Sequence, residues 1–345
     1  MAPTEYTRRW VLGGAVMLAS LRALGVRAAP AADGSMIVTL LGTGGPGPSP
    51  SRFGPSTLVQ AGKTTLLFDA GRGCTIRCQQ IGVGLAALDG VFITHYHSDH
   101  INGLFDVFTL GYLARRPPDA NPAMRSIRTN PLRLWGPTGL DRVAQGLRTA
   151  AKADIDIRTA DEKVNPAAAR FETHPFARDG VIFDEAGVKV MAFAVDHGAL
   201  VKPAYGYRVD YAGHAVLISG DTRLSENLIA HGAGLDLMVH SVAGIAPKWV
   251  DDPDAKATAS HQSSPEDCAA VFGRTKPKMA ALTHILTIGT TPAEIQARIS
   301  ARYDGPLAMG EDLMRFVITD GVAMQRWNPA DRNYATFRVG EGDQS

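Results

Sequence analysis

The stretch FITHYHSDH at residues 92–100 decides how the rest of this sequence is interpreted. It places three histidines and an aspartate within six residues, directly behind the apolar residues 90–94, which are predicted to form a short strand. Imidazole and carboxylate groups suit zinc and related divalent ions. Because neighbouring side chains of an extended chain point in different directions, two ions can use these groups more easily than one. The alternative is a polar helix start with Ser98 or Asp99 as the N-cap and solvated histidines.

Strand and helix patterns first mix and then alternate along the chain, which indicates two β-sheets with helices outside them. No linker divides residues 32–345, so we predict one domain there. The predicted strands are 36–41, 56–60, 65–68, 90–94, 132–135, 181–183, 188–195, 205–209, 215–218, 235–239, 279–283 and 314–318, and the predicted helices are 74–81, 102–114, 139–151, 224–230, 265–272 and 292–303.

Residues 1–31 have the features of an export signal. Thr7-Arg8-Arg9-Trp10 precedes the apolar residues 10–21, and small residues follow at 28–32. This order is typical of a bacterial signal peptide, and the paired arginines indicate the twin-arginine route. We therefore predict cleavage after Ala31, a periplasmic mature protein and no membrane association after cleavage. The alternatives are a membrane anchor or a chance pair of arginines.

Charge and cysteine content narrow the class of protein. Removing residues 1–31 lowers Lys+Arg from 35 to 31 and Asp+Glu from 34 to 33, so the net charge changes from +1 to −2. Proteins that bind nucleic-acid backbones are usually basic, so a net charge of −2 argues against a nucleic-acid partner. The three cysteines, Cys74, Cys78 and Cys268, lack a second pair for a zinc site and are predicted to be buried free thiols.

The segment His95-Tyr96-His97-Ser98-Asp99-His100 resembles the HxHxDH signature of the metallo-β-lactamase-fold hydrolases, in particular their ribonuclease Z and arylsulfatase-like branch. The resemblance implies an α/β fold, an αββα sandwich of two mixed β-sheets with flanking helices. Other segments resemble the superfamily's opening strands, third-histidine, bridging-aspartate and last-histidine segments: Leu41-Gly42-Thr43-Gly44 with Phe68-Asp69-Ala70-Gly71, Asp196-His197-Gly198, Ser219-Gly220-Asp221-Thr222-Arg223 and Leu282-Thr283-His284.

The resemblance implies a site for two divalent metal ions. Zinc is the expected metal, and manganese or iron also suits mixed nitrogen and oxygen ligands. A hydroxide held between two such ions would be the nucleophile at neutral pH. The implied first ligand group is His95, His97 and His197, the second is Asp99, His100 and His284, and Asp221 would bridge the two ions.

Two further residues are candidates for catalysis, and one for support of the site. Asp99 is expected to take part in catalysis as well as in metal binding. His261 resembles the additional histidine of the ribonuclease Z branch and could protonate a leaving oxygen, the alternative being a loop histidine without a role. Asp69 either orients a metal ligand or simply forms the turn before Gly71.

The main functional prediction is an exported, arylsulfatase-like hydrolase of small-molecule esters, acting on sulfuric ester or phosphodiester bonds. The alternatives are a phosphodiesterase similar to ribonuclease Z, a lactonase, or a periplasmic metal-dependent binding protein without turnover. Residues 198–220 are too few for the RNA-binding arm of ribonuclease Z, and Ser241 stands where that family usually has a glutamate. These two differences from ribonuclease Z, together with the export signal and the net charge, favour a small-molecule ester as the substrate. The oligomeric state stays open, a dimer included.

Overall fold

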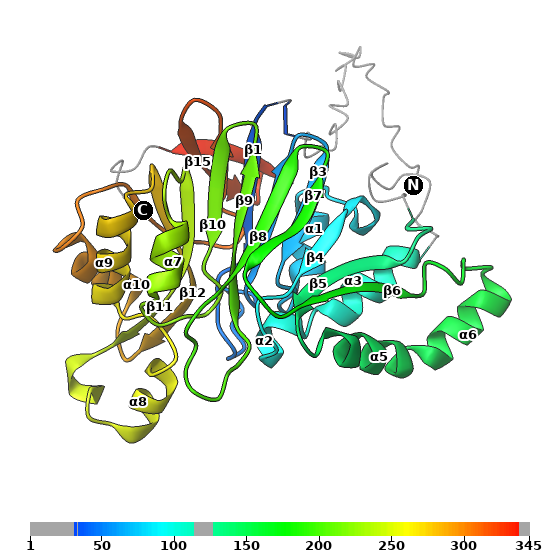
Figure 1. Cartoon of the computed structure of the whole chain (residues 1–345), viewed down its shortest axis with the longest axis horizontal. Coiled ribbons are helices and arrows are strands. Elements are labelled where there is room, and N and C mark those ends of the chain that lie inside the picture. Colours follow the sequence, from blue (N-terminus) through cyan, green and yellow to red (C-terminus); the bar gives the residue numbers. More distant parts are fainter. Residues whose placement is uncertain (1–30, 33, 114–126, 338–345) are drawn as a thin grey trace, which may run out of the picture.

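The computed structural model describes residues 31–32, 34–113 and 127–337, and its two β-sheets lie face to face (Figure 1). In the described part of the chain the first sheet has nine strands in the order β16-β15-β14-β1-β2-β3-β4-β5-β6. The pairs from β16 to β3 are antiparallel, and those from β3 to β6 are parallel. The strands are β1 (Met36–Gly42), β2 (Ser56–Ala61), β3 (Thr64–Phe68), β4 (Gly90–Phe92), β5 (Leu132–Pro137), β6 (Phe171–Phe176), β14 (Arg315–Ile318), β15 (Val322–Asn328) and β16 (Asn333–Phe337).

The second sheet is also mixed and has the order β13-β12-β11-β10-β9-β8-β7. Its pairs from β10 to β13 are parallel, so the carboxyl ends of β10, β11 and β12 meet at one edge. The pairs from β7 to β10 are antiparallel. The strands are β7 (Gly180–Glu185), β8 (Val188–Ala194), β9 (Tyr205–Tyr211), β10 (His214–Ile218), β11 (Leu237–Ile245), β12 (Met279–Ile288) and β13 (Leu307–Met309).

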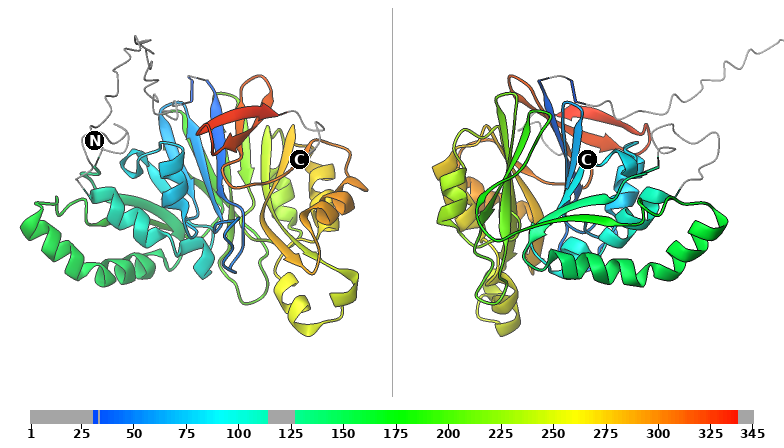
Figure 2. Two further views of the ribbon diagram at one scale, coloured as in Figure 1. Left: turned by 180° about the vertical axis from the view of Figure 1, so that it is seen from behind. Right: turned by 45° about the vertical axis from the view of Figure 1, so that its right-hand side comes forward.

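Helices cover the outer face of each sheet, as the right-hand view of Figure 2 shows. Apolar residues of α1, α3 and α5 pack on the first sheet, and those of α7, α9 and α10 pack on the second. The helices are α1 (Cys74–Gln80), η1 (Leu85–Ala87), α2 (Ser98–Ile101), α3 (Leu104–Tyr112), α5 (Leu140–Ala150), α6 (Lys152–Asp161), α7 (Glu226–His231), η2 (Pro247–Trp249), α8 (Pro253–Ala259), α9 (Pro265–Thr275) and α10 (Pro292–Ser300).

The main core lies between the two sheets and joins residues distant in the sequence. Phe92 of β4 stacks on Phe68 of β3, with ring centroids 4.9 Å apart, and meets Tyr207 of β9 edge-on at 5.9 Å. All three side chains are at most 1% exposed. Replacing such a buried ring by alanine typically costs about 3–5 kcal/mol. The loop after β4 therefore starts from a rigid position.

The predicted α/β fold with two mixed sheets and flanking helices is confirmed. The predicted helix at 102–114 corresponds to α3, which begins at Leu104 and ends at Tyr112, and a separate short helix that was not predicted, α2, ends before it at Ile101. Gly103 lies between α2 and α3 and packs against the backbone of the turn that follows β3. A Cβ added to Gly103 would stand 2.4 Å from the Gly71 carbonyl oxygen. All three cysteines are buried and free, as predicted.

The predicted leader at residues 1–31 falls outside the described residues except for Ala31. Among the residues that the structure describes, none of the helices has the length and apolar character needed to cross a membrane. Cleavage, export and the extent of the mature domain stay predictions.

Candidate metal centre

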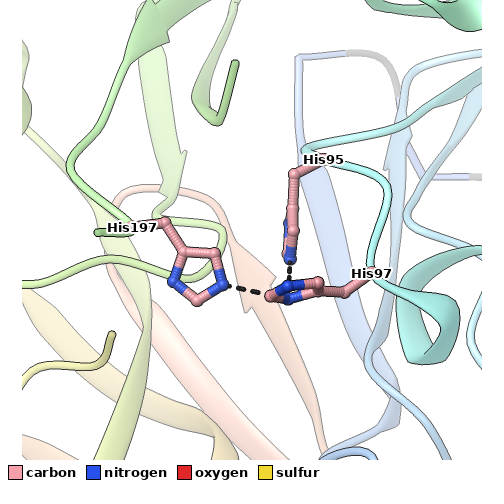
Figure 3. Close-up of side chains that lie close together, drawn as sticks. All are labelled: His95, His97 and His197. Atoms are coloured by element: carbon pink, nitrogen blue, oxygen red, sulfur yellow. Dashed lines mark hydrogen bonds between the residues drawn. The ribbon is translucent and has the colours of Figure 1, made fainter. Parts of the chain in front are cut away.

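The first expected ligand group comes together from both sheets. His95 and His97 follow β4, whereas His197 lies in the segment between β8 and β9. Nδ1 of His97 lies 3.0 Å from Nε2 of His95 and 3.1 Å from Nε2 of His197 (Figure 3). The ligand atoms of the three imidazoles all lie within 4.8 Å of one another. This group matches the first expected metal site.

The second expected group is equally compact. Asp99 and His100 belong to α2, whose first turn begins directly after His97. Nε2 of His284 in β12 lies 3.1 Å from Oδ2 of Asp99, and Nε2 of His100 lies 3.7 Å from the same oxygen. All three residues are buried. Their ligand atoms lie within 4.8 Å of one another, as the second expected metal site requires.

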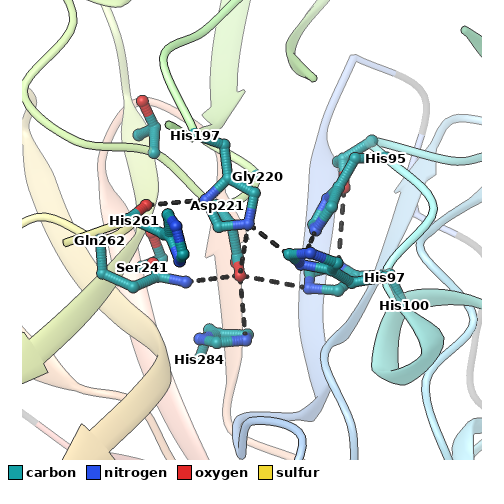
Figure 4. Close-up of polar contacts among 12 residues, drawn as sticks. His95, His97, His100, His197, Gly220, Asp221, Ser241, His261, Gln262 and His284 are labelled. Carbon is teal, nitrogen blue, oxygen red and sulfur yellow. Dashed lines mark hydrogen bonds and ion pairs between the residues drawn. The ribbon is translucent and has the colours of Figure 1, made fainter. Parts of the chain in front are cut away.

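Asp221 lies between the two groups (Figure 4). Its Oδ2 is 3.1 Å from Nε2 of His284, 3.4 Å from Nε2 of His100 and 3.8 Å from Nε2 of His197. The residue follows β10 by way of Gly220, which adopts φ +60° in the turn. One carboxylate therefore faces ligands of both groups, the position expected of a bridging residue.

Three of the histidines, His95, His100 and His197, are held by partners on the ring nitrogen that faces away from the site. Nδ1 of His100 lies 2.7 Å from Oδ2 of Asp69, and Nδ1 of His95 lies 3.0 Å from Oγ1 of Thr94. Nδ1 of His197 lies 2.7 Å from the carbonyl oxygen of His261. Such contacts set the tautomer and orientation of metal-binding imidazoles. Nε2 of each of these rings is left to face the centre.

Asp69 acts as a structural link rather than as a simple turn residue. Besides the contact with His100, its Oδ1 accepts a hydrogen bond of 2.8 Å from the Thr94 backbone N–H. Oγ1 of Thr94 donates to both carboxylate oxygens. The side chain thus joins the end of β3 to the loop after β4. Of the two interpretations made from the sequence, the contacts favour the orienting one.

Sequence reasoning missed two residues that support the site. Thr94 holds Asp69 and His95 together, and Gln262 donates a hydrogen bond of 2.6 Å from Nε2 to Oδ2 of Asp221. Thr94 was available as the last residue of the predicted strand before the first histidine. Gln262 has no signal beyond its place next to His261, because only folding brings residues 221 and 262 together.

Burial and charge set the protonation states of the site. Burial lowers the pKa of His95 well below its ordinary value and also lowers the pKa of His97 and His197. Burial alone would raise the pKa of Asp221, but His284 and His100 beside it hold that pKa well below its usual range. His95, His97 and His197 are therefore neutral at neutral pH, which is the form of imidazole that binds metal. Burial would also lower the pKa of His100, but the carboxylates of Asp221 and Asp69 beside it raise that pKa well above its ordinary value.

His261 contributes two different groups to the site, its backbone carbonyl and its imidazole. Its backbone carbonyl holds His197, and its imidazole lies 5.8 Å from that ring, measured between centroids. The side chain lines a cavity of about 140 Å³ whose other walls include ligand residues of both groups. The imidazole therefore faces the space in which a reacting group could lie. The residues lining the cavity are Pro46, His97, Asp99, His197, Asp221, Thr258, His261, Gln262, His284 and Leu286.

The residues present fit divalent cations. Nε2 of His100 is buried, points to the centre and makes no hydrogen bond to a described residue. Several imidazole nitrogens and two carboxylates converge within contact distance, an arrangement that a cation satisfies better than hydrogen bonds between like groups do. By contrast, His240 is fully buried and packs edge-on against Phe272 of α9, as expected of a core histidine.

Comparison with known proteins agrees with the fold and the site. The beta-lactamase superfamily domain matches residues 64–285. The chain is 35% identical to Ribonuclease Z of Mycobacterium avium (strain 104) over 288 residues, which cover 81% of this chain and 96% of the relative. It is 34% identical to Ribonuclease Z of Mycobacterium marinum (strain ATCC BAA-535 / M) over 282 residues, covering 81% and 97%.

Solved structures share the fold at lower identity. The crystal structure of human tRNase Z, short form (ELAC1), superimposes with a TM-score of 0.59 at 21% identity and covers 82% of this chain and 98% of that one. YhfI from Bacillus subtilis, a metallo-β-lactamase fold protein, gives a TM-score of 0.61 at 16% identity, with coverage of 82% and 99%. With the superfamily match and the mycobacterial relatives, this chain belongs to the metal-dependent hydrolases of the metallo-β-lactamase fold, in their ribonuclease Z branch.

The prediction of an arylsulfatase-like hydrolase is wrong. Relatives that match over 96% of their own length carry the name Ribonuclease Z, and nothing in the comparisons supports action on sulfuric esters. The shortness of residues 198–220 led to the wrong prediction, because the length of this segment shows only whether an RNA-binding arm is inserted there. It carries no information about which bond the site breaks.

The expectation of a small-molecule substrate and no nucleic-acid partner is contradicted by the same relatives, whose name denotes a ribonuclease. The net charge of −2 misled because it is a sum over the whole chain, whereas phosphate is bound by local groups. Divalent cations bound by the ligand-type residues would add positive charge that a count of side chains leaves out.

Proposed function

We propose that this protein is a metal-dependent phosphodiesterase that cleaves RNA. The observation that carries the proposal is the close relationship to the mycobacterial enzymes named Ribonuclease Z, over nearly their whole length. The geometry agrees, because two groups of ligand-type side chains flank one shared carboxylate, Asp221. Zinc is the proposed metal, with two ions per chain, and manganese or iron suits the same ligands.

The ligand residues divide the work between the two groups. His95, His97 and His197 would hold one cation and Asp99, His100 and His284 the other, with Asp221 shared between them. Divalent cations held there would neutralise phosphate charge and make a water molecule more acidic at neutral pH. The outer contacts of Asp69, Thr94 and the His261 carbonyl keep the imidazoles aimed at the centre.

Hydrolysis at this site requires a proton for the leaving oxygen. Water adds to phosphorus and gives up one proton to the solvent, the bond between phosphorus and one ribose oxygen breaks, and that oxygen takes up a proton. The His261 imidazole is placed to supply it, because it lines the cavity beside ligands of both groups. Asp99, in the group with His100 and His284, can accept a hydrogen bond from the attacking water in addition to its role as a ligand.

A second cavity is suited to the rest of an RNA substrate. It has a volume of about 730 Å³ and is lined by residues on both sides of His197 in the sequence, including Val195, Lys202 and Tyr205. The walls are apolar and aromatic and also carry Lys202 and an arginine that pairs with an aspartate. Such walls suit a nucleotide, whose base is flat and whose phosphate is anionic. We assign this cavity to a nucleotide next to the cleaved bond.

Cleavage assays with metal-loaded protein test the proposal. A precursor RNA with a 3′ extension and bis-p-nitrophenyl phosphate are compared after loading with zinc or with manganese. We expect both to be cleaved, and Asp221→Asn to abolish cleavage, because it removes the charge shared by the two ligand groups. The matched control is Asp236→Asn, another buried carboxylate, at the far end of β11, which should leave cleavage intact. Metal-loaded wild-type protein that cleaves neither substrate would overturn the proposal.

A further inference from the structure

His284 reaches the site by way of an irregularity in β12. Ser241 of β11 pairs with Thr283, but the next residue, Val242, pairs with Ile285, so His284 is an extra residue in the ladder. It adopts φ +45°, in the left-handed region that residues other than glycine seldom occupy. Such a bulge re-aims a side chain and needs support from its surroundings.

That support comes from segments at opposite ends of the chain. The Ile285 N–H donates a hydrogen bond of 2.9 Å to the Thr43 carbonyl oxygen, and the Gly310 N–H donates one of 3.1 Å to the Leu282 carbonyl oxygen. These two bonds lie on either side of His284 in the sequence. The backbone position of Thr43 therefore bears directly on the orientation of the imidazole.

Thr43 is in turn held by a buried carboxylate. Oδ1 of Asp312 accepts hydrogen bonds from the Thr43 N–H at 2.9 Å and from Thr43 Oγ1 at 2.8 Å, and its Oδ2 accepts one from the Phe53 N–H at 2.7 Å. Arg52 completes the arrangement with hydrogen bonds of 2.6 Å to both Thr43 Oγ1 and the Gly310 carbonyl oxygen. The Asp312 side chain is 5% exposed. We call Thr43, Arg52 and Asp312 the β12 clamp.

We propose that Asp312, acting through Thr43, is a positioning residue that sets the orientation of His284 and thereby the cation affinity of the group formed by Asp99, His100 and His284. The proposal rests on the metal centre proposed above. Among the described residues, the other group, His95, His97 and His197, shares no hydrogen bond with the β12 clamp. The two groups should therefore respond differently when the β12 clamp is altered.

Titration of metal-free protein with zinc, in competition with a chromophoric chelator, tests the proposal without measuring hydrolysis. Asp312→Asn keeps the size of the side chain but replaces an acceptor oxygen with a donor. We expect the affinity for one ion to fall by about 10- to 100-fold, as for other outer contacts of metal ligands, and that for the second ion to stay unchanged. Thr43→Val, which removes only the hydroxyl contacts, should give a smaller loss at the same ion.

Double variants assign the loss to a ligand group. In a His284→Ala background, Asp312→Asn should have no additional effect on zinc binding, because the residue it positions is gone. In a His95→Ala background, Asp312→Asn should still weaken the remaining ion. Equal additional losses in both backgrounds would overturn the proposal.

Asp236→Asn separates positioning from general loss of stability. Asp236 is also a buried carboxylate, and it accepts a backbone hydrogen bond of 2.9 Å from the Ala215 N–H. It directly precedes β11, however, and so lies at the amino end of that strand, whereas the metal centre lies at the carboxyl ends of the strands. This control should lower the melting temperature without changing zinc affinity. An Asp312→Asn protein that behaves in the same way would show that the β12 clamp serves stability alone. If wild-type protein binds zinc but cleaves neither the RNA nor bis-p-nitrophenyl phosphate, the proposed function fails and the β12 clamp remains testable.

Discussion

Single side chains in this protein have roles that depend on which of their atoms are used. His261 shows this, because its carbonyl oxygen holds His197 whereas its imidazole lines the cavity. A side-chain substitution removes the second role and keeps the first. The residue therefore allows metal binding and chemistry to be separated by one variant.

His261→Ala is expected to slow cleavage by about 10²- to 10⁴-fold on substrates with poor leaving groups, the usual contribution of a general acid. Nitrophenyl esters should be affected least, because their leaving oxygen needs little help from a proton. The measurement is kcat/KM across a series of leaving groups, together with metal content. His197→Ala should instead lose metal and all activity. Full activity of His261→Ala on every substrate would show that the imidazole is not used.

At the level of strands and loops, close backbone packing holds the loop after β1, which borders the site. The loop after β1 places Thr43 beside β12, and its two ends meet at Gly42 and Gly54. An added Cβ on Gly42 would stand 2.0 Å from the Gly54 carbonyl oxygen. Backbone atoms cannot move aside as the tip of a flexible side chain can, so this contact requires glycine.

Gly42→Ala should therefore lower the free energy of unfolding by about 1–3 kcal/mol, the usual cost of overpacking a closely packed position. Gly47→Ala in the same loop is the control, because an added Cβ there meets no atom within 4 Å. Chemical denaturation of the two variants and the wild type provides the comparison. Equal stability of Gly42→Ala and Gly47→Ala would contradict the packing described for this loop.

At the scale of the whole molecule, the proposed metal centre joins the two sheets. The segment from His95 to His100 follows β4 of the first sheet, whereas Asp221 follows β10 and His284 lies in β12 of the second. Cations bound there would link the two halves of the sandwich, and ligands that bind only the folded state stabilise it.

Zinc should bind with close to two equivalents per chain and raise the melting temperature. At 100 times the dissociation constant, one site contributes about 2.7 kcal/mol to folding. Elemental analysis and thermal unfolding, with and without a chelator, provide the measurements. Asp221→Ala should lose at least one equivalent. Saturation of the wild type at a single ion would exclude the arrangement with two.

Export also concerns the whole molecule and stays a prediction from Arg8 and Arg9. The twin-arginine route is expected because it carries folded proteins, and this protein would load metal before export. Replacing both arginines with lysine should leave the precursor inside the cell. Fractionation followed by immunoblotting measures its distribution. An unchanged amount in the periplasm would remove the twin-arginine interpretation.

The sequence by itself determined the class of fold and the ligand-type residues. Strand and helix patterns are local, and HxHxDH places four ligand-type groups within six residues, so both can be recognised without tertiary structure. The resemblance then supplied His197, Asp221 and His284. It did not decide the substrate, because net charge and loop length do not report the bond that a site breaks.

Only the tertiary structure decided how these residues are held. The contacts of Gln262 with Asp221 and of Asp312 with Thr43 join segments 41 and 269 residues apart, and no local pattern records such pairs. The bulge at His284 is likewise invisible in the sequence, because a histidine carries no preference for a left-handed conformation strong enough to predict it. Contacts of this kind arise within each half of the molecule, as where β1 pairs with β14, and the packing of the two sheets then brings the ligands to a common centre.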